Sequence, residues 1–162
     1  MVRKIGLSFA LLCLSWNLWA KPPAAIYQYR TQLDLPTAYQ RVYQALEKQQ
    51  FWVVFDADLG KRMAQFKERW GEDYNRQGLT GARSLVFCNL RWTNALASAD
   101  PDLLALCPLH LSLYAKDSWV NLVMVRPSVL AVGSEAQPLA KKLEEKLIGI
   151  IQQVLKAPAP AE

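Results

Sequence analysis

A two-residue alternation over residues 109–114 constrains the fold of this chain more than any other sequence feature. Leucine occupies every second position there, and His110, Ser112 and Tyr114 occupy the positions between. Because successive side chains of a β-strand point to opposite faces, the pattern predicts a strand with one apolar and one polar face. A sheet that buries one face against a core requires strands of this kind.

The same kinds of pattern predict the other elements. Residues 115–118 predict a hairpin turn, after which residues 119–126 return as a strand that Pro127 ends. The remaining expected elements are strands over 26–35 and 51–55 and around 85–87, helices over 36–50, 61–70 and 137–155, and a short helix that begins at Asp100. The order strand, helix, strand, helix, three strands, helix predicts an α+β fold.

The first 20 residues have the pattern of a cleaved signal peptide. Arg3 and Lys4 precede an apolar run over 5–19, and Ala20 is a small residue suited to the position before cleavage. The run is shorter than the roughly 20 residues of a membrane-spanning helix, so we expect no membrane anchor after cleavage. The mature chain is then expected in an exported, oxidising compartment.

Composition predicts one globular domain over residues 21–156, followed by a disordered tail over 157–162. Of the 162 residues, 52% are hydrophobic and 20% are charged, which is enough apolar material for a core. The formal charge is +5, and without Arg3 and Lys4 it is 17 minus 14, or +3. Since the basic residues form no run, the sequence argues against nucleic-acid binding.

The mature chain contains two cysteines, Cys88 and Cys107, because Cys13 lies in the signal peptide. Cys88 ends one predicted strand and Cys107 begins the next, so the connection returns both to the same edge of the sheet. In an oxidising compartment an even pair predicts a disulfide bond. Two alternatives remain open, namely unpaired cysteines packed in the core, or a metal-binding or redox pair.

The segment from Cys107 to His110 has the residue types of a zinc or copper site. The strand pleat argues against such a site, because positions three apart on a strand point to opposite faces. His110 is also the single histidine of the chain, so further ligands are missing. We therefore predict no metal and no cofactor.

The polar face of the 109–114 strand is a candidate binding surface. His110, Ser112 and Tyr114 alternate there, and Trp119 and Asn121 lie on the hairpin partner. If the helices cover the leucine face, this face is solvated, buried in a homodimer or used to bind a ligand. A serine–histidine pair also suggests nucleophilic catalysis, but the sequence shows neither a strained nucleophile turn nor an orienting acid.

A second group of polar residues falls at predicted strand ends and loops, where binding sites usually lie. The group comprises residues 73–76, Asn89, Arg91, Arg126 and Ser128. Capping and loop hydrogen bonds are one explanation. An anion or small-ligand site built from Arg91 and Arg126 is the alternative.

Four segments resemble a known bacterial family, domain of unknown function 302. They are G-E-D-Y-N-R-x-G-L-T-G at 71–81, G-x-R-S-L-V-F-C-N at 81–89, D-P-D-L-L-A-L-C-P-L-H-L-S-L-Y at 100–114 and V-R-P-S-V-L-A-x-G-S at 125–134. The resemblance implies a fold similar to that of the TATA-binding protein, with a curved antiparallel sheet of about five strands backed by helices on one face. It also implies subunits that pair, and it carries no biochemical activity.

These observations together favour a periplasmic domain with a binding or accessory role over an enzyme. The expected partners are a second copy of the chain or a small ligand on the open sheet face. The alternatives are a redox or metal-handling protein that uses Cys88, Cys107 and His110, or an unrecognised small enzyme.

Overall fold

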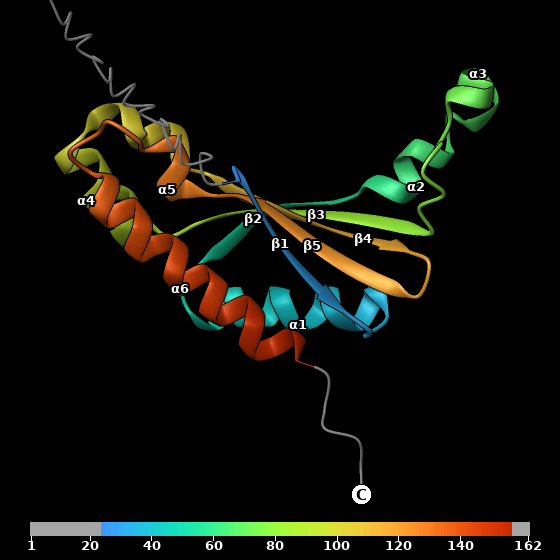
Figure 1. Ribbon diagram of the computed structural model, residues 1–162, viewed down its shortest axis with the longest axis horizontal. Helices are drawn as coiled ribbons and strands as arrows, with labels where there is room; N and C mark the ends of the chain where they lie inside the picture. The colour runs from blue at the N-terminus through green and yellow to red at the C-terminus, as the bar shows by residue number, and fades with distance from the viewer. Residues whose placement is uncertain (1–23, 157–162) are drawn as a thin grey trace, which may run out of the picture.

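The computed structural model describes residues 24–156, which form a five-stranded sheet packed against two long helices (Figure 1). The predicted signal peptide with its cleavage point near Ala20, and the predicted tail over 157–162, lie outside these residues. None of the helices between residues 24 and 156 is long and apolar enough to cross a membrane.

The sheet is entirely antiparallel, with the strand order β1-β5-β4-β3-β2. The predicted α+β class with an antiparallel sheet of about five strands is therefore confirmed. β1 and β2 are the edge strands. The strands are β1 Ile26–Thr31, β2 Trp52–Asp58, β3 Gly81–Cys88, β4 Leu109–Lys116 and β5 Trp119–Val125.

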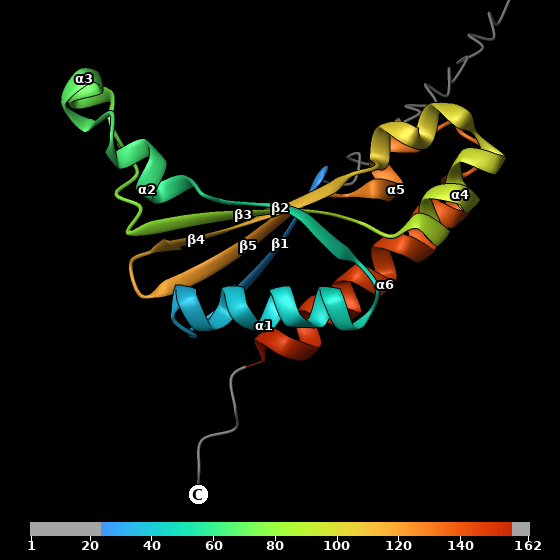
Figure 2. The ribbon, with the colours of Figure 1, turned by 180° about the vertical axis from the view of Figure 1, so that it is seen from behind.

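Two helices, α1 Leu35–Lys48 and α6 Gln137–Leu155, cover one face of the sheet (Figures 1 and 2). α4 lies toward one end of the sheet, and α2 and α3 extend from the other end (Figure 2). The shorter helices are α2 Leu59–Ala64, α3 Lys67–Trp70, η1 Gly71–Asp73, α4 Leu90–Ala99, η2 Pro101–Leu106 and α5 Pro127–Leu130.

The core lies between the sheet and these two long helices. Leu111 and Leu113 of β4 are fully buried there, as the alternation predicted. Phe51 and Phe87 pack edge to face, with ring centroids 6.0 Å apart. α1 begins where it does because the Asp34 carboxylate accepts a hydrogen bond from the backbone N–H of Thr37, an arrangement that satisfies a free donor of the first turn.

A bulge in β2 determines which face its side chains reach. Val53 pairs with Phe87, but Phe55, two residues on, pairs with the adjacent Val86, so Val54 is an extra residue. Such an insertion moves every following side chain to the other face. Phe55 consequently points away from the helices and is 54% exposed, whereas Asp56 and Asp58 point toward α1.

The structure differs from the expected single helix over 61–70. The Asp58 carboxylate caps the backbone N–H of Lys61, so α2 begins earlier, at Leu59, and the chain breaks again before α3. Phe66 and Trp70 stack on each other with ring centroids 5.1 Å apart. They remain 40% and 41% exposed, so their main packing is mutual and not against the sheet.

Candidate ligand-binding site

A cavity of about 1020 Å³ lies at the end of the sheet where α1 begins. Four segments far apart in the sequence line it, namely the start of α1 with the residues before it, α2, the loop that leads into β3, and the β4–β5 hairpin. This volume is at the upper end of the range typical of small-molecule sites. The cavity is therefore the first place to look for a ligand.

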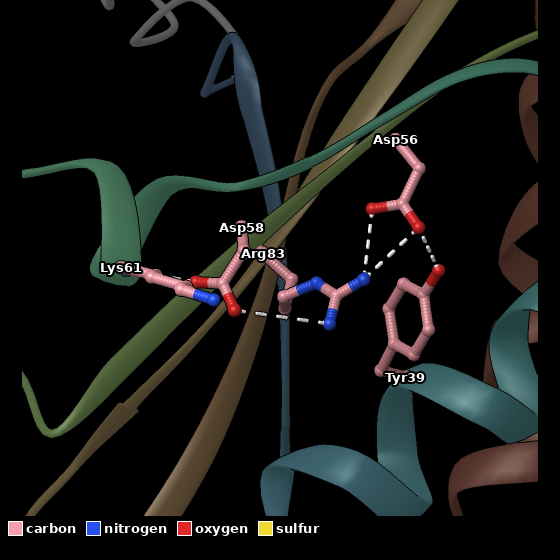
Figure 3. A network of polar contacts seen from close by, with 5 residues as sticks. All are labelled: Tyr39, Asp56, Asp58, Lys61 and Arg83. Carbon is pink, nitrogen blue, oxygen red and sulfur yellow. Dashed lines mark hydrogen bonds and ion pairs between the residues drawn. The ribbon is translucent and has the colours of Figure 1, made fainter.

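Arg83 on β3 is at the centre of a polar network in this cavity (Figure 3). Its Nη2 lies 2.9 Å from both carboxylate oxygens of Asp56 on β2. Its Nη1 lies 4.0 Å from Oδ2 of Asp58. Since β2 and β3 are neighbouring strands, both carboxylates approach Arg83 from the same side of the sheet.

Tyr39 of α1 completes the network from the helix layer. Its hydroxyl donates a hydrogen bond to Oδ2 of Asp56, and its ring lies under the Arg83 guanidinium, 4.0 Å from Cζ to the centroid. Burial, the hydrogen bond to Asp56 and the charge of Asp56 together raise the pKa of Tyr39 to about 12. Tyr39 is therefore a neutral phenol at physiological pH.

The charge of Arg83 is compensated within the protein. Partial burial lowers the pKa of Arg83, but the hydrogen bonds and charge of Asp56 outweigh this effect and raise it, so the group stays cationic. Asp58 in turn accepts the backbone N–H of Lys61 at 2.8 Å. One network therefore links the sheet, α1 and α2, and holds the cavity's polar surface in a fixed geometry.

The rest of the lining combines apolar and aromatic side chains. Leu35 and Leu79 supply aliphatic contacts, while Tyr74 and Trp119 supply aromatic surface. Arg30 lies over the Trp119 ring at 4.5 Å. A fixed polar group beside such a lining is typical of sites that bind small organic molecules.

The structure places Tyr114 and Asn121 directly opposite each other on β4 and β5. Asn121 is only 7% exposed, and its Oδ1 accepts a hydrogen bond from Nε2 of Gln28 at 3.2 Å. Part of its hydrogen-bonding capacity is therefore used within the sheet. That the open face binds a ligand or a second copy of the chain stays a prediction.

His110 and Ser112 lie on the same face, at neighbouring positions of β4. His110 is exposed and pairs with Val86 of β3. The Ser112 hydroxyl donates to Oγ of Ser84 at 3.1 Å, and Ser84 donates to a backbone carbonyl of β4. Within the described part of the chain, the Ser112 hydroxyl is thus bonded to another serine and not to the histidine.

Cys88 and Cys107 form a disulfide bond, as predicted, with Cα atoms 6.0 Å apart. The Thr93 hydroxyl lies 3.2 Å from one sulfur and 3.1 Å from the other. The bond connects the end of β3 to the residue that follows η2, shortly before β4, and holds α4 beside it. Between residues 24 and 156, no group of three or more histidine, cysteine or acidic side chains gathers in a way that could hold a metal ion.

Asn89 and Arg91 line a second cavity of about 440 Å³, between the end of α1 and the start of α4. The Asn89 carboxamide caps α4 by accepting the backbone N–H groups of Arg91 and Trp92 at 3.1 and 3.2 Å. Its Nδ2 donates to the carbonyl of Gln50 at 3.0 Å. The helix end and the preceding turn are thereby held together.

Arg126 lies elsewhere, paired with Glu144 of α6 at 2.7 Å. Ser128 also donates to the Glu144 carboxylate through its backbone N–H and its hydroxyl. Burial raises the pKa of Glu144, but the hydrogen bonds from Ser128 and Arg126 outweigh it and lower the pKa. Arg126 does not line the cavity that contains Arg91.

The sequence reasoning missed the residues of the polar network, which are Tyr39, Asp56, Asp58, Lys61 and Arg83. One signal was available. Asp56 and Asp58 are two apart at the end of a predicted strand, a spacing that places both carboxylates on one face. Their cationic partner Arg83 lies in the G-x-R segment on which the family resemblance rests.

The comparisons with known proteins bear on the family and the fold. Comparison with curated proteins gave no match. A crystal structure of an uncharacterized conserved protein DUF302 from Bacillus stearothermophilus is similar, with a TM-score of 0.68 and 16% identity over 80% of this chain and 98% of that one. Residues 27–154 match the family described as Domain of unknown function DUF302. The chain therefore belongs to the family of unknown function DUF302.

Proposed function

We propose that this protein is a binding module that takes up a small organic ligand in the cavity around Arg83. The observation that carries this proposal is the fixed Tyr39–Asp56–Arg83 network in a cavity of about 1020 Å³. A polar surface that is already held in place costs little ordering when a ligand binds. The cavity draws on four segments, so a ligand would bridge α1, α2 and the hairpin.

The charges of the lining favour a neutral or singly cationic ligand. Three carboxylates line the cavity against two cations (Asp34, Asp58 and Asp117 against Lys61 and Arg83). Asp56 further compensates Arg83 from just outside the lining. Because Asp56 pairs with Arg83, an anion would meet three carboxylates with only Lys61 left to offset them. An aromatic or aliphatic body with one polar end fits the leucine and tryptophan surfaces.

A large side chain introduced into the cavity is expected to weaken ligand binding. Ala64 of α2 is an exposed residue that lines the cavity, and Ala99 of α4 is an exposed alanine outside it. We expect neutral and monocationic aromatic fragments, screened by saturation-transfer NMR, to bind the wild type and Ala99→Trp alike. Ala64→Trp should weaken the binding of these fragments at least tenfold. A screen without any binder, or binders that Ala64→Trp leaves unaffected, would rule the proposal out.

We further propose that the protein works in the periplasm after removal of residues 1–20. The basic and apolar pattern of the leader supports export, and the disulfide between Cys88 and Cys107 is compatible with an oxidising compartment. The mass of the protein recovered from a periplasmic extract is expected to correspond to a chain that begins near Lys21. Recovery of an uncleaved chain from the cytoplasm would contradict this prediction.

A further inference from the structure

We propose a second binding site, for a phosphate-bearing anion, in the cavity of about 440 Å³ between α1, α4 and α6. Three basic side chains converge there from three helices: Lys48 at the end of α1, Arg91 at the start of α4 and Lys146 of α6. The site is independent of the one around Arg83, and the two have opposite charge character.

The cations of this cavity are not compensated, unlike the half-buried arginines elsewhere. Arg83 and Arg126 are each paired with aspartate or glutamate. Within residues 24–156, neither Lys48, Arg91 nor Lys146 has a carboxylate oxygen within 4.0 Å. The other lining side chains are amides, an alanine and a tryptophan, namely Gln49, Gln50, Asn89, Ala95 and Trp92. The lining of this cavity therefore carries a net positive charge.

Three of the hydrogen-bond acceptors in this cavity are already occupied. The Gln50 carbonyl accepts from Asn89, and the Asn89 carboxamide oxygen accepts two backbone N–H groups of α4. The Gln49 carboxamide oxygen accepts from Nζ of Lys146 at 2.9 Å. What remains for a ligand is mainly donors: the ammonium groups and the guanidinium of Arg91. A phosphate presents only acceptor oxygens and suits such a set.

The cavity wall is held in place before any ligand arrives. Asn89 directly follows Cys88 of the disulfide, and the hydroxyl of Thr93, one turn into α4, contacts both sulfurs. Asn89 also holds the start of α4 against the turn after α1. Trp92 is half-buried and offers an apolar surface beside the cations. A phosphate attached to a small organic group would use both features.

The proposal is tested by reversing the charge of two basic residues in the cavity, with the same reversal of two basic residues on α3 as the control. The probe is inorganic pyrophosphate, titrated calorimetrically at low ionic strength, where exposed charges are least screened. We expect it to bind the wild type and the control Lys67→Glu/Arg69→Glu, whose positions lie on α3 at the far end of the sheet (Figure 2). Arg91→Glu/Lys146→Glu should weaken binding at least tenfold.

A second experiment distinguishes a soluble phosphate-bearing ligand from a phospholipid headgroup. Vesicles of phosphatidylglycerol in phosphatidylcholine are sedimented with the same three proteins. Binding of free pyrophosphate indicates a soluble ligand, and vesicle binding alone, with the same dependence on Arg91 and Lys146, indicates a lipid headgroup. If the wild type binds neither pyrophosphate nor vesicles, the proposal is overturned. It is also overturned if the cavity variant and the α3 control weaken binding equally. If circular dichroism shows that the charge reversal unfolds the protein, the neutral variant Arg91→Gln/Lys146→Gln takes its place.

Discussion

Replacement of both Cys88 and Cys107 by alanine is expected to lower the free energy of unfolding by about 3 kcal/mol. The bond closes a loop whose ends are 19 residues apart, and cutting it gives the unfolded chain more conformations. The loss acts mainly on the unfolded state, because Cys88 is the last residue of β3 and Cys107 follows η2, so neither lies in the middle of the core. Urea denaturation at neutral pH, monitored by circular dichroism, measures it.

The wild type under reducing conditions is the matched control, and it should unfold at nearly the same urea concentration as the alanine variant. The variant should keep its far-ultraviolet spectrum, since the five strands pair without the bond. An unchanged free energy of unfolding would contradict a structural role for the disulfide. That outcome would favour the redox alternative, in which the two thiols exchange with a partner.

The sheet and its disulfide could be predicted because the relevant signals are local. The leucine alternation of β4 is visible in the sequence of that strand alone. The short turn between β4 and β5 predicts that the two strands are antiparallel neighbours. Cys88 and Cys107 sit at strand ends that an antiparallel connection returns to one edge. Local pattern and observed contact therefore agree.

The cavity around Arg83 could not be predicted because it depends on the bulge in β2. Without the bulge, Val54 would pair with Val86, and Asp56 would pair with Ser84 and point to the open face. With it, Asp56 pairs with Leu85 and faces Tyr39 and Arg83. β2 begins with a continuous apolar run, W-V-V-F, in which neither face is marked. The register that forms the network is decided by packing and not by local pattern.

The pairing of Arg126 with Glu144 also could not be predicted from local pattern, because it depends on a long-range contact. Glu144 lies in a run of charged residues on the last helix, a pattern typical of a solvent-exposed face, yet it is 3% exposed. Its neighbours Leu143 and Leu147 belong to the core, and α5 covers it from the other side through Ser128. A long-range contact, 18 residues apart in sequence, turned an expected surface residue into a buried one.

Arg126→Met is expected to cost about 3 kcal/mol of unfolding free energy, because it leaves the Glu144 carboxylate buried without its cation. The value is at the low end for such losses, since Arg126 is partly exposed and Ser128 still donates to the carboxylate. Urea denaturation measures the loss. The control is Arg126→Met/Glu144→Leu, which removes both charges and should recover most of the stability.

The pH dependence of this loss identifies Glu144 as its cause. In the wild type the pKa of Glu144 lies below its usual 4.5, so its contribution is fully present above that pH and is lost as the pH falls through the lowered value. In Arg126→Met, the hydrogen bond and charge that lower the pKa of Glu144 are lost, so its pKa rises above the wild-type value. The carboxyl group then protonates earlier on acidification, and its burial stops costing free energy. The difference between wild type and variant should therefore be largest at neutral pH and should shrink as the pH falls through and below 4.5. Urea denaturation of the wild type and the variant at several pH values measures this difference. A difference that stays constant with pH would mean that lost packing of the Arg126 side chain, and not the unpaired charge, destabilises the variant.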